Sequence, residues 1–381
     1  MVDMTFGYGG KGKLSAIADI GVGGVSLSIV QTSGVTSTVL ATGRSVLSFE
    51  PHTPEQSVGM LAAQIKEAGD LALSQYAAHH QKAPILSVHA VIHAPWVHTQ
   101  TVRAAKRFES DTPAQDSHVA ELAKAGLALA TEIDQSRLIE ASVTRIEVNG
   151  YRTKRHENVR VRTLDAVSLI SDCEADVKSA VASALGALFP VAKISWRSGA
   201  RAIAAFVDDT DLSDTDVLII DMSTDTTHVI TLRKGLFEQS IVPEGVRTIL
   251  ARLAGGGLPD ATLGHIRMLE REACSNEACE AVQSAMALAE PDLARIFGEC
   301  IGKMAAVRHV PNDLILITHH DLETWLGRFF TRIDFTQFTI TTLPFEVHTP
   351  QSLGIENWIL GVPQESALAV DTALVNIEAD S

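Results

Sequence analysis

The sequence lacks the long hydrophobic run that a membrane-spanning helix needs. No stretch of about 18 consecutive apolar residues occurs in the chain, so we expect no transmembrane helix. Residues 1–13 lack the apolar segment of a secretory signal peptide. The final stretch, 367–381, ends on acidic residues that include Glu378 and Asp380, and it has no basic amphipathic face for anionic lipid. We therefore predict a cytoplasmic chain that does not insert into a membrane by itself.

Positive charge is also scarce. The chain has 31 Lys and Arg against 46 Asp and Glu, a formal net charge of -15. Such a surface repels phosphate backbones, so we expect no nucleic-acid partner. The exception is the basic stretch 145–162, which includes Arg152, Lys154 and Arg155. It is interpreted either as a solvated hairpin or as a docking patch for an acidic peptide.

Cysteine is rare, and its spacing argues against disulfides and zinc. The chain has four cysteines and no CxxC pair, which predicts free thiols in a reducing compartment. Cys274, Cys279 and His265 are near enough in sequence to suggest a metal site. Their spacing matches no usual zinc pattern, so buried or partly exposed thiols are the competing interpretation.

Two segments of the chain look like copies of each other. Residues 16–30 read AIADIGVGGVSLSIV and residues 218–232 read LIIDMSTDTTHVITL. Each is an apolar strand that reaches an aspartate (Asp19 or Asp221), then small or polar residues, then a second β-rich strand. A glycine, Gly43 or Gly245, follows each aspartate 24 positions later. The pattern predicts a duplication, although two unrelated β-meanders can also look alike.

The repeated unit has a chemical rationale. A tight turn between antiparallel strands presents a row of backbone N–H groups, which binds phosphate when small residues let the backbone approach. An aspartate at the strand end can hold hydrated Mg²⁺. Two such hairpins facing across a cleft would hold a nucleoside triphosphate, with Asp19 and Asp221 on the metal.

The remaining chain alternates between helical and strand patterns. We predict helices over 54–80, 116–133, 172–188 (capped by Asp172), 199–207, 246–253, 261–306, 321–330 and 367–375, and strands over 85–93, 137–148, 159–170, 194–196, 314–317 and 335–347. The three glycines at 255–257 are interpreted as a flexible turn rather than a phosphate loop.

In this order the elements resemble the actin-like ATPases, and within them the bacterial FtsA and PilM families. Asp19-Ile20-Gly21 is similar to their first phosphate motif. Residues 221–228 stand at the second phosphate motif, and 314–321 (LILITHHD) at the adenosine motif. The resemblance implies an α/β, actin-like (ribonuclease H-like) duplicated two-domain fold.

Two further features resemble FtsA and PilM in particular. The strand–helix–strand–strand order between the first helix and residue 172 is similar to their inserted 1C subdomain, and LPFEV at 343–347 with the Ala-rich final helix is similar to the PilM ending. The implied domains are 1A at 1–84 and 171–212, 1C at 85–170, 2A at 213–250 and 311–381, and a helical 2B at 251–310.

The sequence departs from the family pattern in two of the three nucleotide loops. Ser223-Thr224-Asp225 replaces a glycine-rich turn, and His319-His320 replaces paired glycines after Thr318. The family's adenine-side lysine corresponds to Arg267. The resemblance implies nucleotide contacts from Asp19, Gly21, Gly23, Gly24, Asp221, Ser223, Thr224, Thr226, Thr227, Gly245, Arg267 and Thr318, with Mg²⁺ held through water by Asp19 and Asp221.

The resemblance implies a scaffold that recruits partners to a membrane-associated assembly, either a type IV pilus or secretion machine or the division ring. Nucleotide binding would be weakened or lost, and no catalytic residue is expected. The partner implied is a cytoplasmic peptide of a membrane protein docked on the 1C subdomain, which would hold the chain peripheral to the inner membrane; self-association is a further expectation. The alternative is a functional ATP-binding switch or slow ATPase. A small-molecule kinase is a third interpretation, for which no catalytic aspartate motif is found.

Overall fold

A computed structural model of the chain describes residues 13–34, 36–47, 54–80, 83–274 and 276–380. The N-terminal segment 1–12 and the side chains of the acidic tail at 378–380 lie outside this description. No helix within the described ranges is both long and apolar enough to cross a bilayer.

Two sheets share one strand order, which explains the repeat in the sequence. The first sheet has the order β15-β3-β2-β1-β4-β9, and the second β12-β11-β10-β13-β14. In both, three antiparallel strands are followed by parallel strands. The strands of the first sheet are β1 (Lys13–Gly21), β2 (Gly24–Ser33), β3 (Thr36–Val46), β4 (Ser87–Ile92), β9 (Lys193–Ser198) and β15 (Ile359–Leu360); those of the second are β10 (Val217–Met222), β11 (Thr227–Arg233), β12 (Leu236–Val242), β13 (Asp313–Ile317) and β14 (Glu346–His348).

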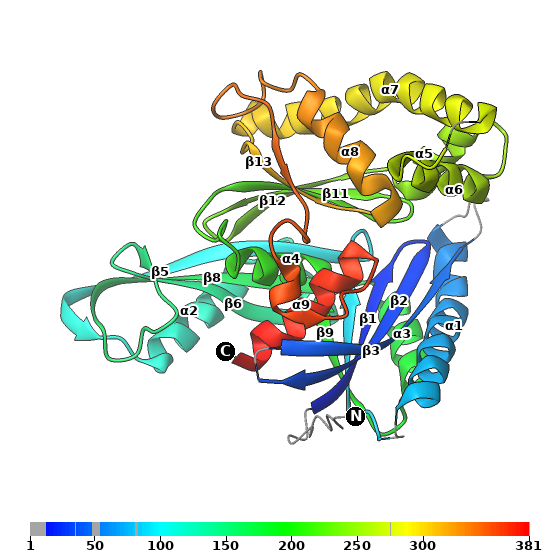
Figure 1. Cartoon of the computed structure of the whole chain (residues 1–381). Helices are drawn as coiled ribbons and strands as arrows, with labels where there is room; N and C mark the ends of the chain where they lie inside the picture. The colour runs from blue at the N-terminus through cyan, green and yellow to red at the C-terminus, as the bar shows by residue number, and fades with distance from the viewer. Residues whose placement is uncertain (1–12, 35, 48–53, 81–82, 275, 381) are drawn as a thin grey trace, which may run out of the picture.

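Helices cover both faces of each sheet, as Figure 1 shows. On the outer face of the first sheet lie α1 (Pro54–His79) and α3 (Ala175–Leu188), and on that of the second lie α5 (Val246–Ala254), α6 (Pro259–Glu270), α7 (Glu277–Val307) and α8 (His320–Arg332). Between the sheets lie α4 (Gly199–Asp208) and α9 (Ser366–Asp380). Because both faces are buried, strands such as β10 are continuously hydrophobic rather than alternating.

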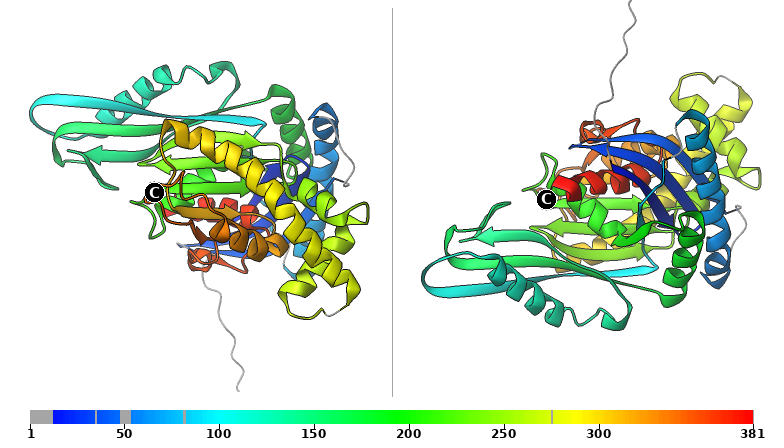
Figure 2. Two further views of the ribbon diagram at one scale, coloured as in Figure 1. Left: turned by 90° about the horizontal axis from the view of Figure 1, so that it is seen from above. Right: turned by 90° about the horizontal axis from the view of Figure 1, so that it is seen from below.

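A third sheet is inserted into the first half and extends sideways from it (Figures 1 and 2). Its order is β5-β8-β6-β7, and α2 (Asp116–Leu129) packs on it. Its strands are β5 (Val97–Pro113), β6 (Leu138–Val148), β7 (Tyr151–Arg152) and β8 (Arg160–Cys173). The strand predicted to open this insert, at 85–93, is instead β4, which pairs with β1 and β9 in the first sheet. The insert opens with β5, for which no strand was predicted.

Three local predictions were wrong. Asp172 does not cap a helix: it lies in β8, its carboxylate accepts a hydrogen bond from the Asp134 amide at 2.7 Å, and α3 begins after Glu174. Of the strand predicted over 335–347, only the last residues are extended, as part of β14. Cys274 and Cys279 form a disulfide, whereas Cys173 and Cys300 are buried free thiols. The helical stretch predicted over 261–306 is two helices, since α6 ends at Glu270 and α7 begins at Glu277. The other predicted helices and strands are confirmed within a few residues.

Candidate functional site between the two sheets

The two sheets meet at a small cavity. It is lined by Asp19, Gly21, Gly24, Ser26, Arg44, His93, Asp221, Met222, Ser223, Thr224, Val246, Thr318, His319, Glu365 and Ala367, and its volume is about 60 Å³. Pockets that hold small molecules usually measure about 300–1,000 Å³. The cavity therefore holds a few waters and no nucleotide in this arrangement.

Asp19 and Asp221 occupy equivalent places in the two sheets. Asp19 is near the end of β1 and pairs with Val91 of β4, and Asp221 is near the end of β10 and pairs with Ile317 of β13. The carboxyl ends of parallel strands meet at one edge of a sheet, so both side chains enter the same cavity. This is the place at which the sequence predicts a metal-bound triphosphate.

A histidine lies between the two aspartates. His93 follows β4, and its amide donates to the Ile20 carbonyl at 3.0 Å. Its Nδ1 is 3.4 Å from Asp221 Oδ2, and its Nε2 is 3.3 Å from Asp19 Oδ1. On the same side, Nε2 is 3.1 Å from Asp371 Oδ2, which comes from the central helix α9. One imidazole thus connects both sheets and the helix between them.

A glycine makes room for this imidazole. A Cβ atom on Gly199, the first residue of α4, would lie 2.3 Å from His93 Nδ1. The Ser198 side chain caps the helix at this point by accepting from the Arg201 amide. The start of α4 is therefore shaped around the His93 ring.

Burial and crowded negative charge control the ionisation of this cluster. Burial raises the pKa of Asp19 to about 7; His93 opposes the shift, and Asp371 and Asp221 add to it. Burial also raises the pKa of Asp371. Burial by itself would lower the pKa of His93, but Asp371 and Asp221 raise it well above its ordinary value. The neighbouring carboxyl groups thus favour a protonated His93, and burial leaves Asp19, with its pKa of about 7, only partly ionised near neutral pH.

The two phosphate-type hairpins touch each other. A Cβ on Gly23 would lie 2.9 Å from Asp225 Oδ2, and a Cβ on Gly24 would lie 2.9 Å from Thr224 Oγ1. Asp225 is in turn held by Arg247 at 2.6 Å. The second hairpin therefore packs onto the first at the level where phosphate groups would lie.

Several residues predicted to touch nucleotide face elsewhere. Thr227 Oγ1 is buried and donates to the Glu244 carbonyl at 2.6 Å, and Thr226 Oγ1 is 3.2 Å from Ser223 Oγ. Gly245 supports the second hairpin, since a Cβ there would be 2.6 Å from the Thr224 carbonyl oxygen.

On the adenosine side, arginines and histidines are engaged with protein groups. Arg267 makes two hydrogen bonds to Asp321, at 2.9 and 2.6 Å. His319 stacks on His320, with ring centroids 4.5 Å apart. Thr318 Oγ1 is buried and has no hydrogen-bond partner among the described residues. The position of the family's paired glycines is thus filled by two imidazole rings.

The residues present do not fit a nucleotide with Mg²⁺ in this arrangement. The cavity is too small, the hairpins are in contact, and the His93 ring stands between the two aspartates expected to hold the metal. Binding would require the two halves to separate.

Sequence reasoning missed His93, Asp371, Arg44 and Glu365. The last two form an ion pair of 2.6 Å at the cavity, between β3 and the residue before α9. One signal was available: Asp371 is the only charged residue in the apolar stretch ALAVDTALV, and a lone buried carboxylate needs a partner. His93 ends the apolar strand predicted over 85–93, which placed it at a strand end, but its partners are distant in sequence and could not be identified.

Comparisons with known proteins support the fold. No protein-family model and no curated protein matches the chain. Among solved structures, a PilM-PilN type IV pilus biogenesis complex has a TM-score of 0.53 at 12% identity and covers 95% of this chain and 98% of that chain. The ethanolamine utilization protein EutJ from Carboxydothermus hydrogenoformans has 0.47 at 12% identity, over 96% and 89% of the two chains. A Bacteroides thetaiotaomicron VPI-5482 protein of unknown function, described as having an actin-like ATPase fold, has 0.38 at 11% identity, over 98% and 99%.

The chain has the actin-like ATPase fold. The duplicated strand order, the two central helices and the inserted third sheet agree with the fold class predicted from the sequence.

Proposed function

We propose that this protein is an actin-like scaffold of the FtsA/PilM type, which recruits a protein partner to a membrane-associated assembly and has weak or no nucleotide binding. The observation that carries the proposal is the contact between the two phosphate-type hairpins over a cavity of about 60 Å³. One fold can serve many functions, and with the ligand site filled by the protein's own side chains we propose that this one acts through its surfaces.

A protein partner is favoured by the similarity to PilM, which was solved together with PilN. We further propose the division into 1A, 1C, 2A and 2B, with the third sheet as 1C. In this proposal the partner is a short cytoplasmic segment of a membrane protein, and this partner brings the chain to the membrane.

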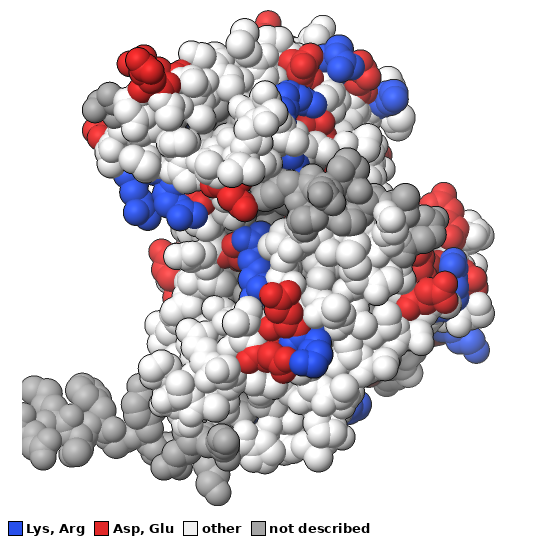
Figure 3. Space-filling view, turned by 90° about the vertical axis from the view of Figure 1, so that its right-hand side faces the viewer, with Lys and Arg blue, Asp and Glu red and all other residues white. Residues whose placement is uncertain are grey.

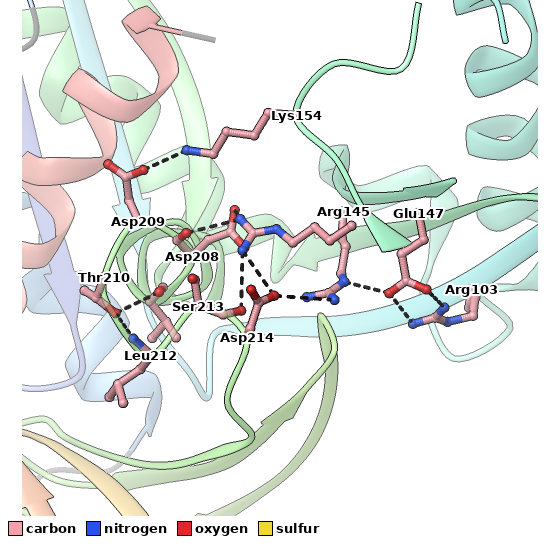
Figure 4. Close-up of polar contacts among 12 residues, drawn as sticks. Arg103, Arg145, Glu147, Lys154, Asp208, Asp209, Thr210, Leu212, Ser213 and Asp214 are labelled. Carbon is pink, nitrogen blue, oxygen red and sulfur yellow. Dashed lines mark hydrogen bonds and ion pairs between the residues drawn. The ribbon is translucent and has the colours of Figure 1, made fainter. Parts of the chain in front are cut away.

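Two of the three basic residues expected to attract an acidic peptide, Arg152 and Lys154, are paired within the protein. Arg152 pairs with Asp208 and donates to the Ser213 carbonyl at 3.4 Å, and Lys154 pairs with Asp209 at 2.9 Å (Figure 4). These contacts tie the β7 hairpin to the connection between α4 and β10. Figure 3 shows the side of the molecule away from the insert, where acidic and basic side chains are interspersed. Charge attraction by Arg152 and Lys154 therefore does not support the proposal.

Strand addition remains the proposed mode of docking. The beginning of the β5 edge of the third sheet is covered, because the Phe237 amide of β12 donates to Thr101 Oγ1 of β5 at 2.7 Å. The other edge is β7, where the side chain of Tyr151 is 79% exposed. We propose the β7 edge as the docking place.

A nucleotide-gated switch is the second candidate. Two observations favour it: the first hairpin keeps Gly21, Gly23 and Gly24, and the Thr318 hydroxyl lines the cavity without a partner among the described residues. Opening of the cleft would then admit ATP and Mg²⁺, and self-association would be nucleotide-dependent.

The test is photo-crosslinking in the native cells, with a crosslinking amino acid in place of Tyr151. We expect a membrane protein to be crosslinked, and the yield to be unchanged by Gly24→Ala, whose added methyl group would lie 2.9 Å from Thr224 Oγ1 and occupy the space between the hairpins. Loss of the crosslink in Gly24→Ala would favour the switch. Absence of a membrane-protein crosslink at Tyr151 and at the matched exposed position Val159 would contradict the scaffold.

A further inference from the structure

Two carboxylates converge on Nε2 of His93, and together the three side chains have the composition of a metal site. We propose that Asp19, His93 and Asp371 bind one divalent transition-metal ion, Zn²⁺ in preference to Mg²⁺. The proposal concerns the closed cleft and does not depend on nucleotide or on a partner.

The donor atoms are spaced as ligands of one ion. Nε2 of His93 is 3.3 Å from Asp19 Oδ1 and 3.1 Å from Asp371 Oδ2, and the three donor atoms lie within 4.8 Å of one another. Zinc bonds to imidazole nitrogen and carboxylate oxygen of about 2.0–2.2 Å put neighbouring ligands of a tetrahedral ion about 3.3 Å apart. A small adjustment of one carboxylate would complete three bonds and leave the fourth position to water in the cavity.

An unpartnered buried oxygen gives independent support. Asp371 is fully buried in α9, and its Oδ1 has no hydrogen-bond partner among the described residues. Asp371 Oδ2 already contacts His93 Nε2 at 3.1 Å, but an unsatisfied oxygen on a buried carboxylate is costly. When ionised, Asp19, Asp371 and Asp221 carry three negative charges around His93; a divalent cation offsets two of them, whereas a proton on His93 offsets only one.

Asp221 is placed to orient the ligand. Its Oδ2 lies 3.4 Å from Nδ1, on the opposite side of the ring from the proposed ion. Accepting the Nδ1 proton leaves the Nε2 lone pair directed at Asp19 and Asp371, which is the usual carboxylate–histidine–metal arrangement. The imidazole nitrogen is the feature that favours Zn²⁺, since Mg²⁺ prefers oxygen ligands.

Two other groups of potential ligands are less suitable. Next to His319 and His320, the Glu365 carboxylate is already paired with Arg44 at 2.6 Å, and the two imidazole rings stack on each other. Asp313, Glu346 and His348 lie at the surface, where Glu346 is exposed.

The ligands come from three elements: β1, the residue after β4, and α9. A bound ion would fasten the final helix to the first sheet, and Asp221 would extend this connection to the second sheet. We therefore infer a structural role, in which the ion stabilises the closed cleft.

The experiment is calorimetric titration of chelator-treated full-length protein with Zn²⁺, followed by zinc K-edge X-ray absorption. We expect one-to-one binding, no heat from Mg²⁺ at equal concentration, and a shell of nitrogen and oxygen only, at about 2.0–2.2 Å. Asp371→Asn should weaken Zn²⁺ binding at least 100-fold, whereas the surface control Asp313→Asn should leave it unchanged.

Opposite results would overturn the site. These are no saturable Zn²⁺ binding by the wild type, sulfur in the metal shell (which would indicate Cys274 and Cys279), or an unchanged affinity in Asp371→Asn together with a loss in Asp313→Asn. If Asp371→Asn does not fold, the wild-type titration and absorption spectrum decide the question alone.

Discussion

His319 is a buried neutral histidine, and this makes the stability of the protein depend on pH in a defined direction. Burial lowers its pKa to about 3; Arg44 and His320 contribute in the same direction, as does Arg267, and Asp321 opposes them. Its Nδ1 also accepts a hydrogen bond from the Asp321 amide at 3.3 Å, which caps α8. A proton on Nδ1 would remove that cap.

The direction and size of the pH effect on stability follow from the lowered pKa of His319. The folded-state pKa lies below the unfolded value of 6.5, so the stabilising effect is fully present above pH 6.5 and is lost as the pH falls toward 3. Each pH unit below 6.5 costs about 1.4 kcal/mol, which gives about 2 kcal/mol between pH 7.5 and pH 5.

The assay is urea unfolding at pH 7.5, 6.5 and 5 for the wild type, His319→Asn and the exposed-residue control His309→Asn. Asparagine can still cap the helix but does not titrate. We expect the wild type and His309→Asn to lose about 2 kcal/mol more than His319→Asn on going to pH 5. Equal losses in all three proteins would refute a neutral buried His319.

Four other outcomes are expected. Asp225→Asn should strengthen ATP binding about tenfold, or about 1.4 kcal/mol, by removing a carboxylate beside the phosphate position; calorimetry checks this, with the exposed Asp292→Asn unchanged. Gly43→Ala should destabilise the fold by about 3 kcal/mol or more, because its Cβ would lie 2.1 Å from the Ala68 carbonyl oxygen. The control Gly59→Ala, whose Cβ would have nothing within 4 Å, should stabilise the fold by up to about 1 kcal/mol. Arg152→Met should cost about 1.5–3 kcal/mol in urea unfolding, and the more exposed Lys154→Met less than about 0.5 kcal/mol. The purified chain should remain in the supernatant when sedimented with anionic liposomes, and strong pelleting would point to an anchor within the chain.

The strands of the two repeated sheets were predictable because helices cover both faces of each sheet. Strands such as β10 are uniformly apolar, so they are visible in a sequence without tertiary information. The strand β5 was not predicted because it leaves the body of the protein: most of it is partly or fully exposed and carries charged residues without a clear period. The matched 24-residue spacing does not reflect the duplication, because Gly43 lies within β3 against α1, whereas Gly245 lies beyond β12 and precedes α5.

The site was predictable only where a residue follows a recognisable strand. Asp19 and Asp221 were found in this way, and both line the cavity. His93 and Asp371 are 278 positions apart, and only the packing of α9 between the sheets brings them together. A single sequence contains no pattern at that separation.

Titration of the purified wild-type chain with ATP, with and without Mg²⁺, tests the central claim most directly. Because the hairpins are in contact and the cavity measures about 60 Å³, we predict binding weaker than about 100 µM, if saturable at all, and only with Mg²⁺. A dissociation constant below about 1 µM, or tight binding without metal, would contradict the account and would establish a working nucleotide site.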